Sequence, residues 1–432
     1  MKIAQFSTFP YGGAATAAIR LHQHLRDVGV ESEFFYHRNL KDTIVDPTFH
    51  QVSFDTSANQ PRNFFSKRLE RRRQKQIYRQ YNDDVAMRPE GFDTFSMARL
   101  PKLTSLDWQQ IDTDVIHIHW LSYFADYPTF FESIPNHIPI FWTLHDMNAF
   151  TGGCHYSAGC TRFATGCGHC HQVAKPSFKD VSAASFTAKK QSLRNKKIQV
   201  IAPCDWMKNQ AMQSDIFPNS TQFQTIRYGL DLDTFFPRDP AIMRKELGIN
   251  PETVVIAFGA DDIKNRRKGM NHLIAALKYL NTQSQVECIL FGSGEIESSS
   301  ETPLIHSLGY IHSVEKQAAI YSAADIVVVP SREDNQPQVG LEAMACGTPV
   351  VGFAAGGIPE YVRHGETGLV VELGNERELA ETINWFVDQP EARKSMGTQA
   401  RIMMEQEFEI QAQTKKHEQL YRNSIRSYLA AA

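Results

Sequence analysis

The sequence predicts an α/β protein built on two doubly wound parallel sheets. Short apolar runs alternate with longer segments of helical periodicity, which is the pattern of strands and crossover helices in such sheets. The alternation occurs twice along a chain of 432 residues, and this length exceeds the size at which one hydrophobic core usually stops growing. We therefore expect two domains.

The first half contains the elements that open such a sheet. We predict a strand at Lys2–Ser7, a turn at Gly12 and Gly13, a helix at Thr16–Val28, and strands at Val115–His119 and Ile138–Leu144. The glycine pair is either a plain turn or a point where backbone amides approach a phosphate, because glycine leaves the backbone uncovered.

The second half repeats the pattern. Strands are predicted at Val254–Phe258, Val286–Phe291, Ile326–Val329 and Pro349–Phe353, with helices at Met270–Leu280, Val314–Ser322 and Val339–Cys346. The segment Ile226–Pro240 is rich in Gly, Asp and Pro, which is typical of a connection between domains. We expect domains at residues 1–225 and 226–405, followed by a helix at 406–432 that packs back on the first domain.

Charge and hydropathy argue against two classes of partner. With 45 Lys and Arg against 48 Asp and Glu, the formal net charge is −3, which gives no global attraction to nucleic acid. No uninterrupted apolar run reaches the roughly 18 residues of a membrane span, and the first residues lack the apolar core of a signal peptide. We expect a cytoplasmic protein.

The segment Asp325–Val351 carries the clearest chemistry. A predicted strand leads into an acidic loop, and a helix follows. Asp334 in the loop and Glu342 in the helix can each accept hydrogen bonds from the vicinal hydroxyls of a sugar. The amides that open the helix, at Gln338 and Val339, suit a phosphate. Together these groups describe a nucleotide-sugar site; a capped surface helix with incidental acids is the alternative.

The same segment resembles the donor-site signature of family 4 retaining glycosyltransferases, also called glycosyl transferases group 1. The matching stretches are EAMACGTPVV at Glu342–Val351, GGIPE at Gly356–Glu360 and GETGLV at Gly365–Val370. Members of this family have the GT-B fold, in which two Rossmann-like domains face each other across a cleft. The resemblance implies that Glu342 holds the ribose hydroxyls and Asp334 the transferred sugar, with Glu333 as a rival to Asp334.

The acidic loop also departs from the family pattern. Asp334 stands where Glu is commoner, and Asn335, Gln336 and Pro337 replace a Gly-aromatic-Gly stretch. Proline has no N–H, so one amide contact typical of the family is lost at Pro337. The resemblance therefore does not identify the sugar.

Basic and glycine-rich positions extend the resemblance. Lys268 matches the family's diphosphate-binding Lys, and we assign to Arg267 the role of an Arg that is absent from its usual position. The other donor-side positions that the resemblance implies are Gly292, Gly294, Ile311 and His312. A solvated helix start and ordinary turns are the simpler interpretations of these residues.

Three histidines belong to the predicted first sheet. His145 follows the strand Ile138–Leu144 and matches the family's active-site His, so the resemblance places it near the transferred sugar and the donor phosphate; a structural histidine is the alternative. His117 and His119 lie two positions apart, and we expect one on each face of the sheet. His119 is the candidate for the acceptor side.

The resemblance implies a retaining, metal-independent hexosyl transfer in which the departing phosphate accepts the proton of the acceptor. His145, Asp334, Lys268 and Arg267 would be the catalytic residues. The donor would be a UDP-sugar, or a GDP-sugar, and the acceptor a glycan or a lipid-linked glycan in bacterial-type surface polysaccharide or glycoconjugate biosynthesis. A sugar-nucleotide epimerase or hydrolase, and a non-catalytic nucleotide-sugar-binding module, are the alternatives.

A cysteine-rich loop follows His145. Its four cysteines are Cys154, Cys160, Cys167 and Cys170. Four thiolates can hold zinc tetrahedrally, and the final CGHC resembles half of a zinc site. A structural zinc, reduced thiols and a disulfide all stay open. A subset of the family, of polysaccharide-biosynthesis type, resembles this loop, which implies an insertion on the acceptor side.

The stretch Arg62–Arg79 is a predicted basic helix with an apolar side. It is either a solvated charged helix or a surface that docks on anionic lipid at the inner face of the membrane, where a lipid-linked acceptor would lie.

Overall fold

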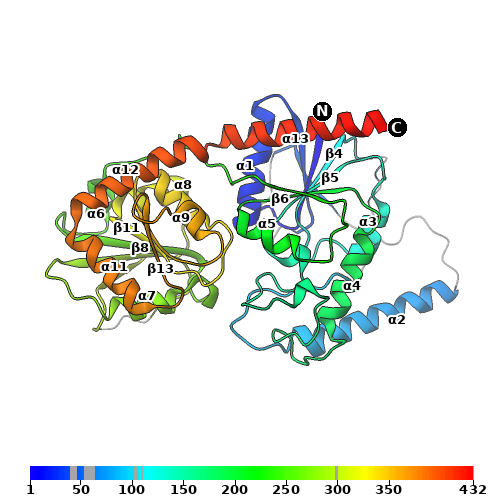
Figure 1. The fold of residues 1–432 in the computed structure, drawn as a ribbon, viewed down its shortest axis with the longest axis horizontal. Helices are drawn as coiled ribbons and strands as arrows, with labels where there is room; N and C mark the ends of the chain where they lie inside the picture. The colour runs from blue at the N-terminus through cyan, green and yellow to red at the C-terminus, as the bar shows by residue number, and fades with distance from the viewer. Residues whose placement is uncertain are drawn as a thin grey trace. The chain divides into compact units, whose positions relative to one another are not determined.

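The computed structural model describes residues 1–38, 46–52, 64–101, 106, 108, 110–296 and 300–431. Arg62, in the predicted basic helix, lies outside these residues. The chain divides into two compact units: Met1–Arg227 with Thr414–Ala432, and Tyr228–Gln413. Each unit is built around one parallel sheet covered by helices (Figure 1).

The sheet of the first unit has the order β3-β2-β1-β4-β5-β6-β7 among the described strands. These are β1 (Lys2–Ser7), β2 (Glu31–Tyr36), β3 (Phe49–Gln51), β4 (Val115–Trp120), β5 (Ile140–Thr143), β6 (Ile198–Ala202) and β7 (Gln222–Thr225). Strands β2 and β3 follow β1 on one side of it, and β4 then lies on the other side of β1. Ligands bind such sheets at the carboxyl ends of the strands, near this change of direction.

Helices and an aromatic core stabilise the first unit. The helices are α1 (Gly13–Asp27), α2 (Phe64–Gln80), α3 (Tyr127–Ser133), α4 (Val181–Leu193) and α5 (Asp205–Met212). The side chain of Asp180 accepts a hydrogen bond from Ser182 N at 3.0 Å, which satisfies an amide that the start of α4 leaves without a helical partner. Beneath the sheet, the rings of Phe6, Phe124 and Phe130 pack edge to face.

The sheet of the second unit has the order β10-β9-β8-β11-β12-β13 among the described strands. They are β8 (Val254–Asp262), β9 (Val286–Ser293), β10 (Leu304–Ser307), β11 (Ile326–Val329), β12 (Val350–Phe353) and β13 (Gly368–Val371). The helices are α6 (Pro240–Glu246), α7 (Met270–Leu277), α8 (Val314–Ala323), α9 (Gln338–Ala345), α10 (Ile358–Tyr361), α11 (Glu376–Asp388) and α12 (Pro390–Glu407). Helices α7 and α11 pack together on one face of the sheet, and α8, α9 and α12 lie on the other (Figure 1).

The last helix, α13 (Ile410–Ala431), begins in the second unit and continues into the first. Its residue Tyr421 is fully buried. The Tyr421 ring packs against Phe141 of β5, with ring centroids 4.9 Å apart, and its hydroxyl lies 2.7 Å from His117 Nδ1. Tyr421 of α13 is therefore part of the core of the first unit.

The predicted doubly wound α/β class is confirmed, and two predicted strands, Lys2–Ser7 and Ile326–Val329, have the observed ends. The expectation for His117 and His119 was wrong. Their rings lie on the same side of β4, with centroids 4.2 Å apart, because side chains two positions apart in a strand point to the same face. Among the described residues, no helix is both long and apolar enough to cross a bilayer.

Candidate functional site

The loop after β11 holds Asp334 against two cations. Asp334 Oδ2 lies 2.7 Å from Lys268 Nζ and 2.9 Å from Arg267 Nη1, and only 4% of the Asp334 side chain is exposed. Burial opposes ionisation of this carboxyl, but the charges of Lys268 and Arg267 outweigh that effect and hold the pKa of Asp334 far below its ordinary range. The cluster therefore contains a carboxylate anion between two cations.

Two glycines allow this close arrangement. Gly356 has φ +58°, and a Cβ built there would lie 1.8 Å from the carbonyl oxygen of Asp334; Gly357 N donates to the same oxygen at 3.0 Å. Gly269 has φ +80°, and its Cβ would lie 1.8 Å from Pro330 O. Only glycine fits at either position, so the turn before α7 lies directly against the end of β11.

Further contacts join the turn before α7 to the acidic loop. Arg267 Nη1 donates to the backbone oxygen of Glu333 at 2.9 Å, and Arg332 N donates to Arg267 O at 2.8 Å. The Arg332 guanidinium contacts His272 Nε2 at 3.2 Å, and His272 Nδ1 lies 2.8 Å from Glu376 Oε1. A neutral His272 donates to the carboxylate and accepts from the guanidinium. Sequence reasoning missed this chain of side chains.

Helix α9 carries the second predicted acid. Glu342 is 6% exposed, and the Tyr321 hydroxyl donates to its Oε2 at 3.0 Å. In the preceding loop, Gln336 Oε1 accepts from Tyr228 N at 2.8 Å, and Asn335 Nδ2 donates to the Tyr228 hydroxyl at 3.4 Å. The two amide side chains that depart from the family pattern are thus engaged with the segment that opens the second unit.

The remaining predicted donor positions lie at the same carboxyl edge of the sheet. Gly292 N, at the end of β9, donates to Gly309 O at 2.8 Å, and a Cβ on Gly292 would lie 2.0 Å from Ala260 O. Ile311 is buried and its carbonyl accepts from Gln317 Nε2 at 2.9 Å. Gln338 and Val339 form the first turn of α9, Gly294 follows β9, and His312 is exposed after β10.

In the first unit, polar side chains gather where β4 and β5 end. His145 Nε2 lies 3.0 Å from His119 Nδ1, and His119 Nε2 lies 2.8 Å from Gln5 Oε1. Burial lowers the pKa of His145 to about 4 and that of His119 well below its ordinary value, so both rings are neutral at pH 7. Gly12, with φ +88°, precedes α1, and a Cβ on it or on Gly13 would meet nothing within 4 Å.

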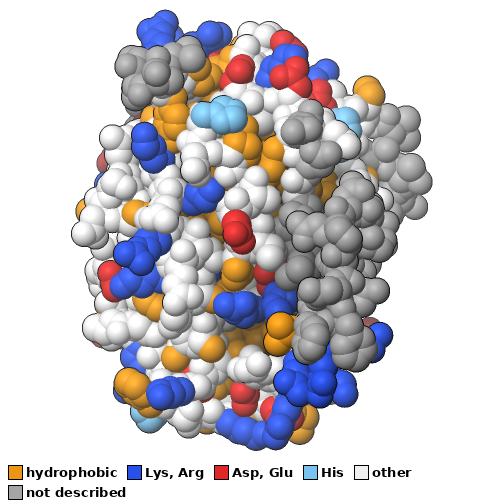
Figure 2. Space-filling model, turned by 90° about the vertical axis from the view of Figure 1, so that its right-hand side faces the viewer, with side chains coloured by type: hydrophobic (Ala, Val, Ile, Leu, Met, Phe, Trp, Pro, Cys, Tyr) orange, Lys and Arg blue, Asp and Glu red, His pale blue; other side chains and the backbone are white. Residues whose placement is uncertain are grey.

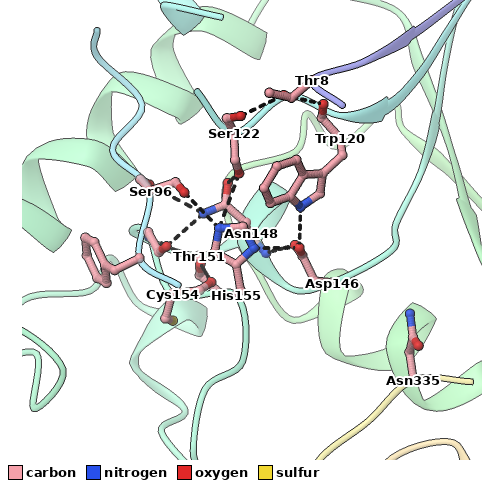
Figure 3. Close-up of polar contacts among 12 residues, drawn as sticks. Thr8, Ser96, Trp120, Ser122, Asp146, Asn148, Thr151, Cys154, His155 and Asn335 are labelled. Carbon is pink, nitrogen blue, oxygen red and sulfur yellow. Dashed lines mark hydrogen bonds and ion pairs between the residues drawn. The ribbon is translucent and has the colours of Figure 1, made fainter. Parts of the chain in front are cut away.

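Asp146, the residue after His145, anchors a separate network (Figure 3). Its Oδ2 accepts from Trp120 Nε1 and from His155 Nδ1, each at 2.6 Å, and its Oδ1 accepts from Asn148 N at 2.8 Å. Burial opposes ionisation, but the neighbouring His155 and these hydrogen bonds lower the pKa of Asp146. His155 Nε2 in turn lies 2.9 Å from Ser96 Oγ. Sequence reasoning missed this network, although Asp146 directly follows His145.

The four clustered cysteines line one small cavity of the first unit, of about 20 Å³. All four are free thiols, and burial raises the pKa of Cys167 to about 12 and that of Cys170 above its usual value. In the part of the chain that the structure describes, no group of three or more His, Cys, Asp or Glu side chains is arranged to hold a metal ion. The zinc site stays a prediction.

Comparisons with known proteins agree with this geometry. Residues 241–403 match the family model described as Glycosyl transferases group 1. The chain is 36% identical over 172 residues to D-inositol 3-phosphate glycosyltransferase of Mycobacterium sp. (strain JLS), which covers 38% of this chain and 39% of that protein. It spans 39% to 55% of the length of the first curated relatives that it matches.

Two solved structures are similar over nearly the whole chain. Sucrose-phosphate synthase from Thermosynechococcus elongatus has 20% identity and a TM-score of 0.66, with all of both chains covered. Anabaena HepE, in complex with UDP and glucose, has 16% identity and a TM-score of 0.64, with 98% of this chain and 100% of that one covered. At this identity the likeness shows the fold. Residues 241–403 are similar to the glycosyl transferases group 1 family, and the chain has the GT-B fold.

Proposed function

We propose that this chain is a retaining glycosyltransferase that moves a sugar from a nucleotide diphosphate sugar to a hydroxyl acceptor. The observation that carries the proposal is the ion cluster of Lys268, Arg267 and Asp334 within the group 1 domain. It places two cations and one anion at the carboxyl edge of a Rossmann-like sheet. Cations there suit the donor diphosphate, and carboxylates suit sugar hydroxyls.

The cations are partly exposed to solvent. The side chains of Lys268 and Arg267 are 24% and 16% exposed, whereas Asp334 is buried between them and the loop backbone. Negative charge grows on the leaving diphosphate as the sugar departs, and fixed cations stabilise that charge most in the transition state. Asp334 holds the two cations together before the donor arrives and then accepts hydrogen bonds from the sugar. Glu342, oriented by Tyr321, binds the ribose hydroxyls.

The reaction needs no additional base. The bond between the sugar C1 and the diphosphate oxygen breaks, and the acceptor oxygen bonds to C1 on the same face. The proton of the acceptor passes to the departing phosphate oxygen. Since Lys268 and Arg267 neutralise the leaving group, we propose transfer without a metal ion.

The solved fold relatives support the proposed donor class, and helix α2 supports the proposed acceptor class. Anabaena HepE was solved with UDP and glucose, which favours a UDP-sugar, with a GDP-sugar as the second choice. The mycobacterial relative is named for an inositol phosphate acceptor. For this chain we propose a glycan or lipid-linked glycan acceptor at the inner face of the membrane.

Helix α2 supplies the surface for membrane docking. Its basic face, which we define as the exposed residues Arg68, Arg71, Arg72, Lys75 and Arg79, also carries the exposed side chains of Leu69 and Tyr78. Ile77 is buried, and Arg73 forms an ion pair with the buried Asp126, so the helix is fixed to the first unit on its other side. Lys and Arg side chains gather low on the molecular face at the level of α2 (Figure 2).

Liposome sedimentation tests this surface. The protein should pellet with vesicles that contain anionic lipid and stay in solution with neutral vesicles, because charge and apolar burial act together. Arg71→Glu with Arg72→Glu should abolish pelleting. Lys415→Glu with Lys416→Glu, at exposed positions of α13, is the matched control. Binding that ignores lipid charge, or that survives the α2 reversal, would contradict membrane docking.

A thermal-shift screen of UDP-, GDP- and ADP-sugars tests the proposed function without an acceptor. One nucleotide class should raise the midpoint of unfolding, because a ligand that binds only the folded state stabilises it. Incubation with that donor alone should then release sugar slowly. Rapid hydrolysis or epimerisation would identify a different enzyme, and binding without turnover on any glycan acceptor would identify a binding module.

A further inference from the structure

A continuous hydrogen-bonded chain runs through the first unit from His145 to the surface. Beyond His119 and Gln5, Gln5 Nε2 donates to Ser32 Oγ at 2.8 Å. Ser32 Oγ lies 2.8 Å from His22 Nδ1, His22 Nε2 lies 3.0 Å from Thr48 Oγ1, and Thr48 Oγ1 donates to Asp46 Oδ1 at 2.7 Å. The chain passes from β5 through β4, β1 and β2 to α1 and the residues before β3.

The side chains between the two ends of this hydrogen-bonded chain are buried in the protein. Gln5, Ser32 and His22 are fully buried, and Thr48, His119 and His145 are less than 9% exposed. Asp46, by contrast, is exposed. Buried polar groups almost always have hydrogen-bond partners. Here the partners follow one another in a linear series, so the donor or acceptor role of each group determines the role of the next.

The exposed carboxylate of Asp46 determines which group donates in every hydrogen bond of this series. An ionised carboxylate only accepts, and hydrogen bonds from the Thr48 hydroxyl and backbone lower the pKa of Asp46. The Thr48 hydroxyl therefore donates to Asp46 and must accept from His22 Nε2–H. Burial lowers the pKa of His22 to about 4, so the ring is neutral, and its Nδ1 accepts from the Ser32 hydroxyl.

The same logic continues to the other end. The Ser32 oxygen accepts from the Gln5 amide N–H, which turns Gln5 Oε1 toward His119. His119 Nε2–H donates to that oxygen, and its Nδ1 must accept from His145 Nε2–H. A neutral His145 with its proton on Nε2 has Nδ1 as its acceptor nitrogen.

We propose that Asp46, Thr48, His22, Ser32, Gln5 and His119 are positioning residues that fix the tautomer of His145. The inference rests on the proposed function for its purpose: an acceptor nitrogen binds a sugar hydroxyl and repels a phosphate oxygen. His145 is thereby assigned to a sugar hydroxyl and not to a phosphate oxygen.

NMR of protein that carries ¹⁵N in its histidine rings tests the proposal. The measurement needs neither a substrate nor an activity assay. The ¹⁵N shifts of His145, identified by its loss in His145→Gln, should show the Nε2–H tautomer in the parent protein. Thr48→Val removes the hydroxyl between His22 and Asp46 while keeping the side-chain shape. His22 can then donate through Nδ1, Gln5 can turn over, and the Nε2–H fraction of His145 should fall by about half or more.

Thr48→Ser, which keeps the hydroxyl, should restore the parent tautomer, an outcome that a purely structural role would not produce. Asp46→Ala, at the surface, is a second variant for the case that Thr48→Val does not fold. It should also reduce the Nε2–H fraction of His145. An unchanged His145 tautomer in folded Thr48→Val or Asp46→Ala protein would overturn the proposal, as would an Nδ1–H tautomer in the parent. Because no donor is present, failure of the proposed function would leave these spectra unaffected, and the two failures are distinguishable.

Discussion

Asp334 shows how one side chain organises the candidate donor site. Its carboxylate pairs with both Lys268 and Arg267, which would otherwise repel each other, and Gly356 lets the loop backbone close around it. The residue types and their order could be predicted from the sequence, but the choice between Asp334 and Glu333 stayed open there. The structure assigns the ion pairs to Asp334; Glu333 contributes its carbonyl oxygen.

The ion cluster makes stability depend on pH in a defined direction. The pKa of Asp334 is lowered in the folded protein, so its stabilising effect is fully present above the unfolded pKa of about 4 and is lost as pH falls toward the folded value. Asp334→Asn should lower the free energy of unfolding by about 1–3 kcal/mol at pH 7.

The deficit of Asp334→Asn should shrink at pH values below about 4. Urea unfolding at both pH values measures it. Asp233→Asn, at an exposed acid of the same unit, should change little at either pH. A deficit of equal size at neutral and acid pH would show that the charge of Asp334 is not what matters.

The hydrogen-bond partners of Asp146 could not be predicted from the sequence. The partners of Asp146, namely Trp120, His155 and Asn148, come from β4 and from the loop after β5. Their meeting depends on the register between β4 and β5 and on the path of that loop. Neither property is visible in residue spacing. The pairing of His119 with His145 has the same origin.

At the scale of elements, the predicted strands include those with continuous apolar runs, such as β11 and the Val254–Phe258 part of β8. The strands without a prediction include β7, whose sequence is QFQT, and β10, whose sequence is LIHS; both are at sheet edges and only partly buried. An edge strand needs one apolar face at most, so its composition resembles that of a loop. Such a strand forms because the neighbouring strand pairs with its backbone, and this pairing is not visible in the sequence.

The loops on either side of α10 provide a matched pair of glycine substitutions. Gly356→Ala adds a Cβ at 1.8 Å from Asp334 O, whereas Gly365→Ala, also at positive φ, adds one in open space. Both variants should lose about 1–2 kcal/mol of stability from backbone strain. Gly356→Ala should lose more and should also weaken nucleotide-sugar binding, measured by titration calorimetry. Equal losses in the two variants would contradict the close packing around Asp334.

Helix α13 is held to the first unit by a buried hydroxyl. Tyr421→Phe removes the partner of His117 Nδ1 and should lower the free energy of unfolding by about 1–2 kcal/mol, because a buried ring nitrogen is then left without its hydrogen bond. Tyr428→Phe, on the same helix and partly exposed, should have little effect. Urea denaturation of both variants gives the comparison, and indistinguishable stabilities would refute the role of the Tyr421 hydroxyl.

The cysteine loop gives a prediction about zinc binding that metal analysis decides. Four thiols around one cavity require about one equivalent of zinc per chain if they form a tetrahedral site, and chelation should then lower the unfolding midpoint. Metal analysis of purified protein measures this. Less than about a tenth of an equivalent would remove the zinc interpretation and leave reduced thiols. Burial raises the pKa of Cys154, Cys167 and Cys170, which makes these three poor nucleophiles.

At the scale of the whole molecule, the two units share one architecture and differ in their relation to the family. The family model matches only residues 241–403, within the second unit. The cysteine loop, α2 and the chain from His145 to Asp46 all belong to the first unit. We expect donor chemistry to follow the family and acceptor recognition to be particular to this chain.

Lys268→Ala tests the central claim most directly. Titration of the preferred nucleotide sugar should show binding weakened by about tenfold or more, and turnover with an acceptor should fall by about 10²–10³, because the leaving diphosphate loses a fixed cation. Lys278→Ala, at a surface lysine after α7 that pairs with Glu301, should retain both properties. Near-normal binding and turnover in folded Lys268→Ala protein would contradict the proposed donor site.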